Sequence, residues 1–162
     1  VNFEIHEGKG NFTSYIFSLP QKYKEANSPF QIFDREVYSF GFFYRMIKDG
    51  KSFITWEKNV NTTLLNKIDE EKFSSDFELH GKLYRFFEED KTLTYTEKIG
   101  NDTKKHQFTL RHIFIWNVTT NHRTSGFAYT RETKVSTDEC VYAILNRWGA
   151  SENTEPGFRI RR

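Results

Sequence analysis

The sequence lacks pairs of cysteines and long apolar runs. Its 162 residues include one cysteine, Cys140, so no disulfide can form within the chain. A structural zinc site built from several thiolates is excluded for the same reason. No apolar run approaches the roughly 18 residues that a membrane-spanning helix needs. We therefore expect no membrane insertion by this domain.

The chain also has nearly equal numbers of positive and negative side chains. The 24 Lys and Arg residues against 22 Asp and Glu leave a net charge of +2 at pH 7. Such a balance does not predict the basic surface of a nucleic-acid-binding protein, so we expect no nucleic-acid partner. Glycine is scarce, with nine residues, and the cluster Gly8-Lys9-Gly10 precedes a strand-like segment. A phosphate-binding loop needs the opposite order, with its glycines leading into a helix.

Aromatic residues are abundant where other apolar residues are few. They make up 17% of the chain, within a hydrophobic total of 36%. A core built largely from rings favours a sheet over a helical bundle, because flat side chains pack well on pleated surfaces. The length predicts a single domain over residues 1–162.

The region before residue 60 predicts a β-hairpin. Residues 37–47 alternate between two faces, as in a strand, and a second strand-like run covers 52–56. Asp49-Gly50 between them is typical of a type I′ turn. The turn would pair Met46 with Phe53.

Short strand-like segments continue along the rest of the chain. Glu88-Glu89-Asp90 reads as an acidic turn between two of them, and Gly100-Asn101-Asp102 as a second turn. The longest segment places its apolar residues on both faces, and its length predicts a bulge or bend. The segments are 3–6, 12–19, 73–79, 83–87, 92–97, 107–119 and 127–135.

One helix is predicted, near the C-terminus. Ser136 and Glu139 form a capping box at its start, and Gly149 provides a stop. The apolar arc of this helix spans roughly 140°, wider than an ordinary surface stripe. A sheet that curls around the helix would bury it. The arc comprises Cys140, Val141, Ile144, Leu145 and Trp148.

These patterns predict a mainly β fold with one C-terminal helix (α+β), in which a curved antiparallel sheet wraps the helix. Cys140 is expected to be a buried structural residue rather than a nucleophile.

No group of residues predicts catalysis or metal binding. His106 and His112 share one strand face, but two ligands do not make a zinc site. The acids at Glu88-Glu89-Asp90 are typical of a solvated turn. We therefore expect a non-enzymatic domain without a cofactor or metal.

With no sign of catalysis or metal binding, we expect the domain to recognise a ligand at its surface. Its aromatic-rich composition suits carbohydrate binding. A ring stacks on the apolar face of a sugar while polar groups bind its hydroxyls. Two patches offer this chemistry, and the alternative for each is that the tryptophan belongs to the core. The first patch comprises Arg45 and Trp56; the second comprises Trp116, Asn117, His122, Arg123, Tyr129 and Arg131.

Several short motifs resemble the receptor-binding head of the rotavirus outer-capsid spike protein. The similarity covers roughly the last 100 residues through short, degenerate motifs. The first 50 residues match the better-known heads poorly, and the known glycan contacts cannot be carried over residue by residue. The motifs are Trp56-Glu57 with Asn59-Val60-Asn61-Thr62, Lys82-Leu83-Tyr84 with Leu93-Thr94-Tyr95 and Asn101, Arg131-Glu132, and Cys140-Val141-Tyr142-Ala143-Ile144-Leu145-Asn146.

The resemblance implies attachment to host cell-surface glycans at the outer capsid of a virion, with the domain joined to the remainder of the spike. Better-known heads are galectin-like β-sandwiches, which remain the alternative fold. Heads of a divergent group, the group B viruses, look like a sheet clasping a helix and are linked to galactose- and N-acetyllactosamine-type glycans. The wide apolar arc of the helix favours this second form.

The alternative function is a protein–protein interaction domain that takes up a peptide along a sheet edge, as an adaptor module does. An enzyme is the third possibility.

Overall fold

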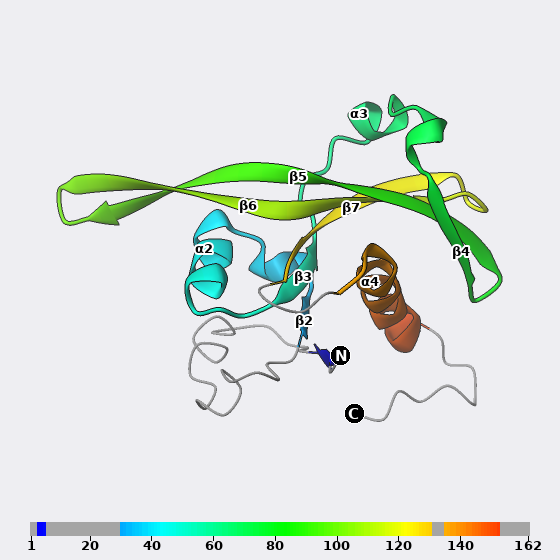
Figure 1. The fold of residues 1–162 in the computed structure, drawn as a ribbon, viewed down its shortest axis with the longest axis horizontal. Helices are drawn as coiled ribbons and strands as arrows, with labels where there is room; N and C mark the ends of the chain where they lie inside the picture. The colour runs from blue at the N-terminus through cyan, green and yellow to red at the C-terminus, as the bar shows by residue number, and fades with distance from the viewer. Residues whose placement is uncertain (1–2, 6–29, 131–134, 153–162) are drawn as a thin grey trace.

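The computed structural model describes residues 3–5, 30–130 and 135–152 (Figure 1). Its strands form a single seven-stranded sheet in the order β1-β2-β3-β7-β6-β5-β4. The strands are β1 (Phe3–Ile5), β2 (Phe30–Phe33), β3 (Phe53–Trp56), β4 (Ser75–Leu79), β5 (Lys82–Ile99), β6 (Asp102–Asn117) and β7 (His122–Tyr129). The helices are α2 (Phe40–Lys48), α3 (Thr62–Asn66) and α4 (Thr137–Glu152), with 3₁₀ turns at Arg35–Val37 and Glu70–Lys72.

The predicted mainly β fold with a C-terminal helix is confirmed. The strands of the described residues belong to one curved sheet, not to the two packed sheets of a galectin-like sandwich. The sheet is mixed rather than wholly antiparallel, because β1, β2 and β3 pair in parallel. Parallel neighbours need a long crossover connection, and the connection from β2 to β3 contains α2.

The predicted strand over 37–47 is wrong, because residues 40–47 belong to α2. The Ser39 side chain caps this helix by accepting a hydrogen bond from the Phe42 backbone N–H. Apolar residues stand at nearly every position here, so the segment satisfies a helical period as well as a strand period. Gly50, with φ of 67°, follows the end of the helix and makes no hairpin, so the predicted pairing of Met46 with Phe53 does not occur.

The β5–β6 hairpin is longer and more regular than predicted. The expected break at Glu88-Glu89-Asp90 is wrong, since β5 runs through it, and β6 pairs with β5 from Tyr84 to Ile99 without a bulge. Gly100, with φ of 63°, stands at the first central position of the connecting turn, as a type II′ turn requires. Beyond the end of β7 the hairpin projects as a two-stranded ribbon, residues 91–99 and 102–110 (Figure 1).

The sheet is apolar on both faces, and helices cover each of them. One face of β6 carries Ile113 and Ile115, which pack in a cluster with α4. The predicted alternation along β6 is confirmed, since its other face packs against α2 near the ribbon and against the α3 region at the far end. The residues on that second face are Phe108, Leu110, Phe114 and Trp116.

Helix α4 begins as predicted. The Ser136 backbone N–H donates to Glu139, and the Glu139 N–H donates to the Ser136 hydroxyl, which completes the capping box. Cys140, Val141 and Ile144 are fully buried against the sheet. The predicted stop at Gly149 is wrong, because the helix continues to Glu152.

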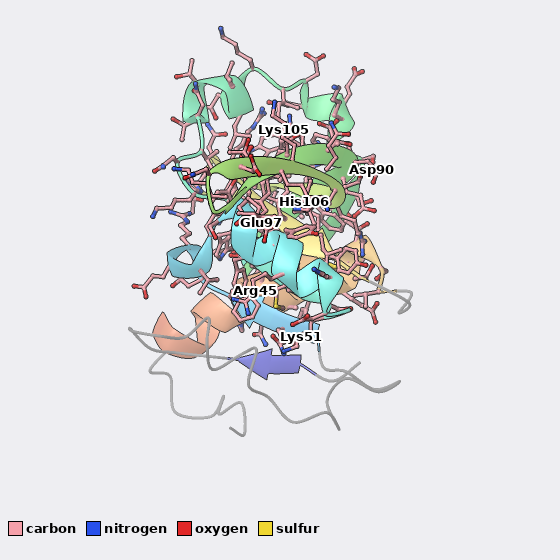
Figure 2. The ribbon with its side chains drawn as sticks, turned by 90° about the vertical axis from the view of Figure 1, so that its left-hand side faces the viewer. Arg45, Lys51, Asp90, Glu97, Lys105 and His106 are labelled. Atoms are coloured by element: carbon pink, nitrogen blue, oxygen red, sulfur yellow. The ribbon has the colours of Figure 1, made fainter. Side chains whose placement is uncertain are left out.

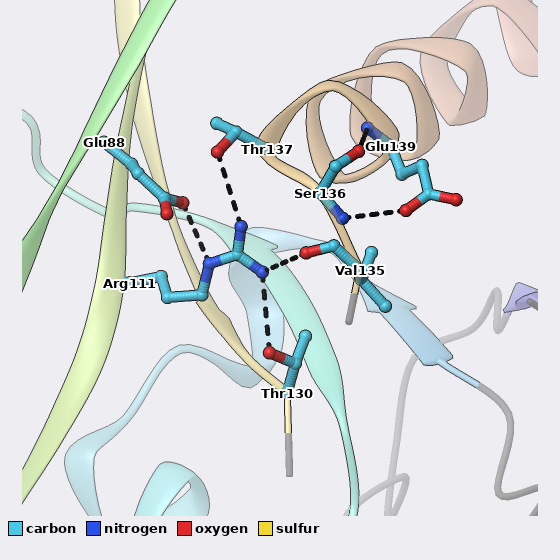
Figure 3. Close-up of polar contacts among 7 residues, drawn as sticks. All are labelled: Glu88, Arg111, Thr130, Val135, Ser136, Thr137 and Glu139. Carbon is cyan, nitrogen blue, oxygen red and sulfur yellow. Dashed lines mark hydrogen bonds and ion pairs between the residues drawn. The ribbon is translucent and has the colours of Figure 1, made fainter. Parts of the chain in front are cut away.

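Arg111 attaches the start of α4 to the sheet (Figure 3). Its Nε donates to Glu88 at 2.8 Å, and the same guanidinium donates to the Val135 carbonyl oxygen at 2.8 Å. Longer bonds of 3.5 Å reach the hydroxyls of Thr130 and Thr137. One side chain of β6 therefore holds the end of β7 and the first turn of α4 together.

We expect Arg111→Met to destabilise the fold by about 1.5–3 kcal/mol, the cost of losing charge-assisted hydrogen bonds. Chemical denaturation measures the free energy of unfolding. Lys105→Met, at an exposed position of the ribbon, is the control and should stay within about 0.5 kcal/mol of the parent. Equal stability of the two variants would contradict the role of Arg111.

The Cys140 thiol should resist thiol reagents in the folded protein. The residue is fully buried on α4, and burial raises its pKa to about 12, so almost no thiolate forms at neutral pH. Labelling should therefore follow unfolding. Fast labelling without denaturant would contradict the packing of α4.

Candidate functional site

The two tryptophans expected to bind sugars belong to the core. Trp56 is 5% exposed and packs in the cluster that includes α4. Trp116 is 7% exposed, its indole N–H donates to Asn121, and its ring lies 5.6 Å from that of Phe73. Neither ring has a face available to a sugar, so the stacking role predicted for both is wrong.

Arg123 is also a structural residue. It is 8% exposed and donates hydrogen bonds to the Leu65 and Ile68 carbonyl oxygens, at 3.0 and 2.7 Å. Its guanidinium lies 4.7 Å from the centre of the Trp116 ring and 5.0 Å from that of Phe73. Arg123 therefore fastens the α3 region to the sheet and is not available to a ligand.

The structure brings together part of the second predicted patch and separates the two members of the first. In the second patch, Asn117 pairs with the exposed His122 next to Trp116, but Tyr129 stands at the opposite end of β7. The Asn117 side chain accepts from the Thr120 N–H. Arg131 lies outside the described residues. In the first patch, Arg45 is exposed on α2 while Trp56 is buried on β3, because the expected hairpin does not form.

A largely buried polar cluster that we did not predict links β6 and β7 to Glu57, the residue after β3. Glu57 Oε2 lies 2.8 Å from His112 Nε2 and accepts a hydrogen bond from the Ser125 hydroxyl at 2.5 Å. The His112 ring is held between Phe114 and Phe127, at centroid distances of 4.2 and 4.4 Å. The cluster thus sits on the sheet face between the α2 and α3 regions.

The surroundings keep the Glu57 carboxylate charged. Burial raises its pKa, but the hydrogen bonds from His112 and Ser125 and the charges of His112 and Lys91 outweigh that effect, so the net pKa is lowered. The pKa of Tyr38 is raised to about 12, chiefly by burial and further by the Glu57 charge.

A serine, a histidine and a carboxylate do not make a nucleophilic site in this arrangement. The serine hydroxyl and the imidazole both bind the same carboxylate oxygen, so His112 is not placed as a base for Ser125. Ser125 is also 0% exposed, and a substrate could not reach it. The geometry supports a structural role, in which Glu57, the residue after β3, binds Ser125 in the middle of β7 and His112 of β6.

One signal of this cluster was present in the sequence. His112 is a polar residue on an otherwise apolar face of β6, which predicts a buried partner for it. The partner itself was not predictable, because Glu57 lies 55 residues from His112 and 68 from Ser125.

A second polar and aromatic group lies where α2 meets the ribbon, and we call it the ribbon corner: Tyr44, Tyr95, Glu97 and His106. His106 Nε2 lies 2.8 Å from Glu97 Oε2. The Tyr44 ring stacks on the imidazole with a centroid distance of 4.2 Å and a 22° interplanar angle. Figure 2 shows Glu97 and His106 between the ribbon and α2. Unlike the core rings, the two tyrosines here are only partly buried.

The chain matches no protein-family model, and a search among curated proteins also finds no match. Within the described part of the chain, no three His, Cys, Asp or Glu side chains gather in a way that could hold a metal ion. None of the helices described there is long and apolar enough to cross a membrane.

We expect Glu57→Gln to destabilise the protein by about 1–3 kcal/mol at neutral pH, because His112 and Ser125 lose a charged partner. A carboxylate with a lowered folded pKa stabilises the fold above its unfolded pKa, near 4.5, and loses that contribution as the pH falls through the folded value. The difference from the parent should therefore shrink towards about pH 3.

Urea unfolding at both pH values measures this difference. Glu78→Gln, at an exposed carboxylate on β4, is the matched control and should show little difference at either pH. If the difference in unfolding free energy between Glu57→Gln and the parent does not change with pH, the charge of the Glu57 carboxylate does not stabilise the fold.

Proposed function

We propose that this chain is a non-enzymatic carbohydrate-binding head of a viral spike protein, which attaches the virion to host cell-surface glycans of the galactose or N-acetyllactosamine type. The observation that carries the proposal is the curved sheet that holds α4 through Cys140, Val141 and Ile144. This is the arrangement that the resemblance to divergent rotavirus heads implies. In this proposal the domain acts at the outer capsid, joined to the remainder of the spike.

The acid–imidazole pairs support a binding role over a catalytic one. Glu57 and His112 connect strands inside the sheet, with a buried serine as their third member. Glu97 and His106 are neighbours across the ribbon, beside stacked tyrosine rings. Rings beside polar groups suit sugar recognition, which needs an apolar surface and hydrogen bonds but no activated nucleophile.

Affinity at a single site should be low. A site on an open surface removes little area from water, and binding must still offset the lost freedom of the ligand. A spike that presents several heads would gain strength by multivalency. The test must therefore display the domain in many copies.

The test is a glycan array probed with the folded domain displayed on a multivalent carrier. We expect reproducible binding to galactose- or N-acetyllactosamine-terminated glycans, reduced by the free sugar in competition. The same carrier bearing heat-unfolded domain is the control and should not bind. An array that stays silent with folded, multivalent domain would contradict the proposed function.

A second candidate function has its own structural support. Within the described residues, β5 pairs with β4 only up to Phe86, and β6 pairs with β7 only from Arg111 onward. Both outer edges of the ribbon therefore have no strand beside them there, and such edges accept extended peptides. A stoichiometric protein partner that slows amide exchange over 91–99 or 102–110, together with a silent glycan array, would favour this function.

A further inference from the structure

We infer that the sugar binds at the ribbon corner, on the rings of Tyr44 and Tyr95, and that it is a neutral sugar with an apolar ring face. This inference rests on the proposed function and deepens it by locating the site. The corner replaces the two patches predicted from the sequence, whose tryptophans are buried.

The rings at this corner lie at the edge of the core, where the ribbon extends past α2. Moving along this face towards the ribbon tip, the pair Leu93–Phe108 is buried and the pair Tyr95–His106 is partly buried. The next pair, Glu97–Lys104, is reachable from solvent, and Glu97 is 40% exposed. A ligand approaching from the tip would therefore meet polar groups and ring surface together.

The aromatic surface is held in a fixed arrangement. The Tyr95 ring lies 5.7 Å from Tyr44 and 6.2 Å from His106, and is nearly parallel to the imidazole. Gly41 of α2 lies against the same ring, since a Cβ at that position would come within 3.0 Å of it. The helix thus approaches the ribbon closely because residue 41 has no side chain. Preorganised rings reduce the entropy that a ligand must offset on binding.

Charges at the corner are balanced. Glu97 and Asp102 on this face of the ribbon are matched by Lys104 on the ribbon and by Lys48, whose ammonium lies 5.9 Å from the centre of the Tyr44 ring. Such a balance provides hydrogen-bond donors and acceptors for hydroxyls without a net field that would select an acidic sugar. We therefore expect the neutral form of a glycan to bind at least as well as its sialylated form.

Two substitutions test the site, each with a matched control. Tyr44→Leu removes the stacking ring, and Tyr142→Leu changes an exposed tyrosine on α4. Glu97→Gln removes a carboxylate charge at the corner, and Glu78→Gln removes one on β4. The measurement is binding of the multivalent domain to N-acetyllactosamine and to its sialylated form, with thermal unfolding to verify the fold of each variant.

We expect about tenfold weaker binding for Tyr44→Leu and for Glu97→Gln, and parent-like binding for both controls. Glu97 is partly exposed, so its variant keeps the test decisive if Tyr44→Leu does not fold. A parent that binds N-acetyllactosamine while Glu97→Gln binds equally well would overturn the site and leave the proposed function standing. A parent that binds only sialylated glycan would overturn the inferred neutral ligand. A parent that binds neither would contradict the proposed function itself.

Discussion

Two adjacent residues of β6 hold the two sides of this fold together. Arg111 and His112 point to opposite faces of the sheet because side chains alternate along a strand. Arg111 reaches the start of α4 on one face, and His112 reaches Glu57 on the other. Both faces of the sheet are apolar, so both must be covered, and each covered face has a charged contact that fixes its geometry. The β6 strand pairs with β5 without a bulge, so the positions of these two contacts on opposite faces of the sheet are fixed relative to each other.

The sequence predicted the parts of the fold that depend on local patterns. The capping box of α4 and the two faces of β6 follow from residue spacing alone, and the structure confirms both. The sequence does not identify the helix at residues 40–48, because apolar residues at most of these positions satisfy a strand period as well as a helical one. The acids at 88–90 resemble a turn in the sequence but occupy a strand, where Glu88 meets Arg111 from the neighbouring strand. That partner lies 23 residues away, so only the tertiary structure could identify it.

The candidate site also depends on contacts between distant residues that the sequence could not predict. An aromatic residue with polar neighbours in the sequence is consistent with a sugar-binding site. The same pattern is equally consistent with a cation–aromatic contact in the core. Trp116 and Arg123 form the second kind, because the α3 region covers them. Tyr95 and His106 meet because β5 pairs with β6, and Tyr44 joins them because α2 packs on the ribbon, where the sequence had placed residues 37–47 in a strand. The sequence suggests a pair of His106 with His112, but in the structure the partners of His106 are Glu97 and the rings of Tyr44 and Tyr95.

Among the described residues, many rings are buried in the core, whereas Tyr44 and Tyr95 are only partly buried at the corner where the ribbon extends past α2. Amide and aromatic NMR shifts recorded during titration with N-acetyllactosamine test this view most directly. The account predicts saturable shifts centred on Tyr44, Tyr95, Glu97 and His106, with those of β4 and α4 unchanged. Shifts centred on the β6–β7 turn around His122, or no shifts at all at high sugar concentration, would contradict it.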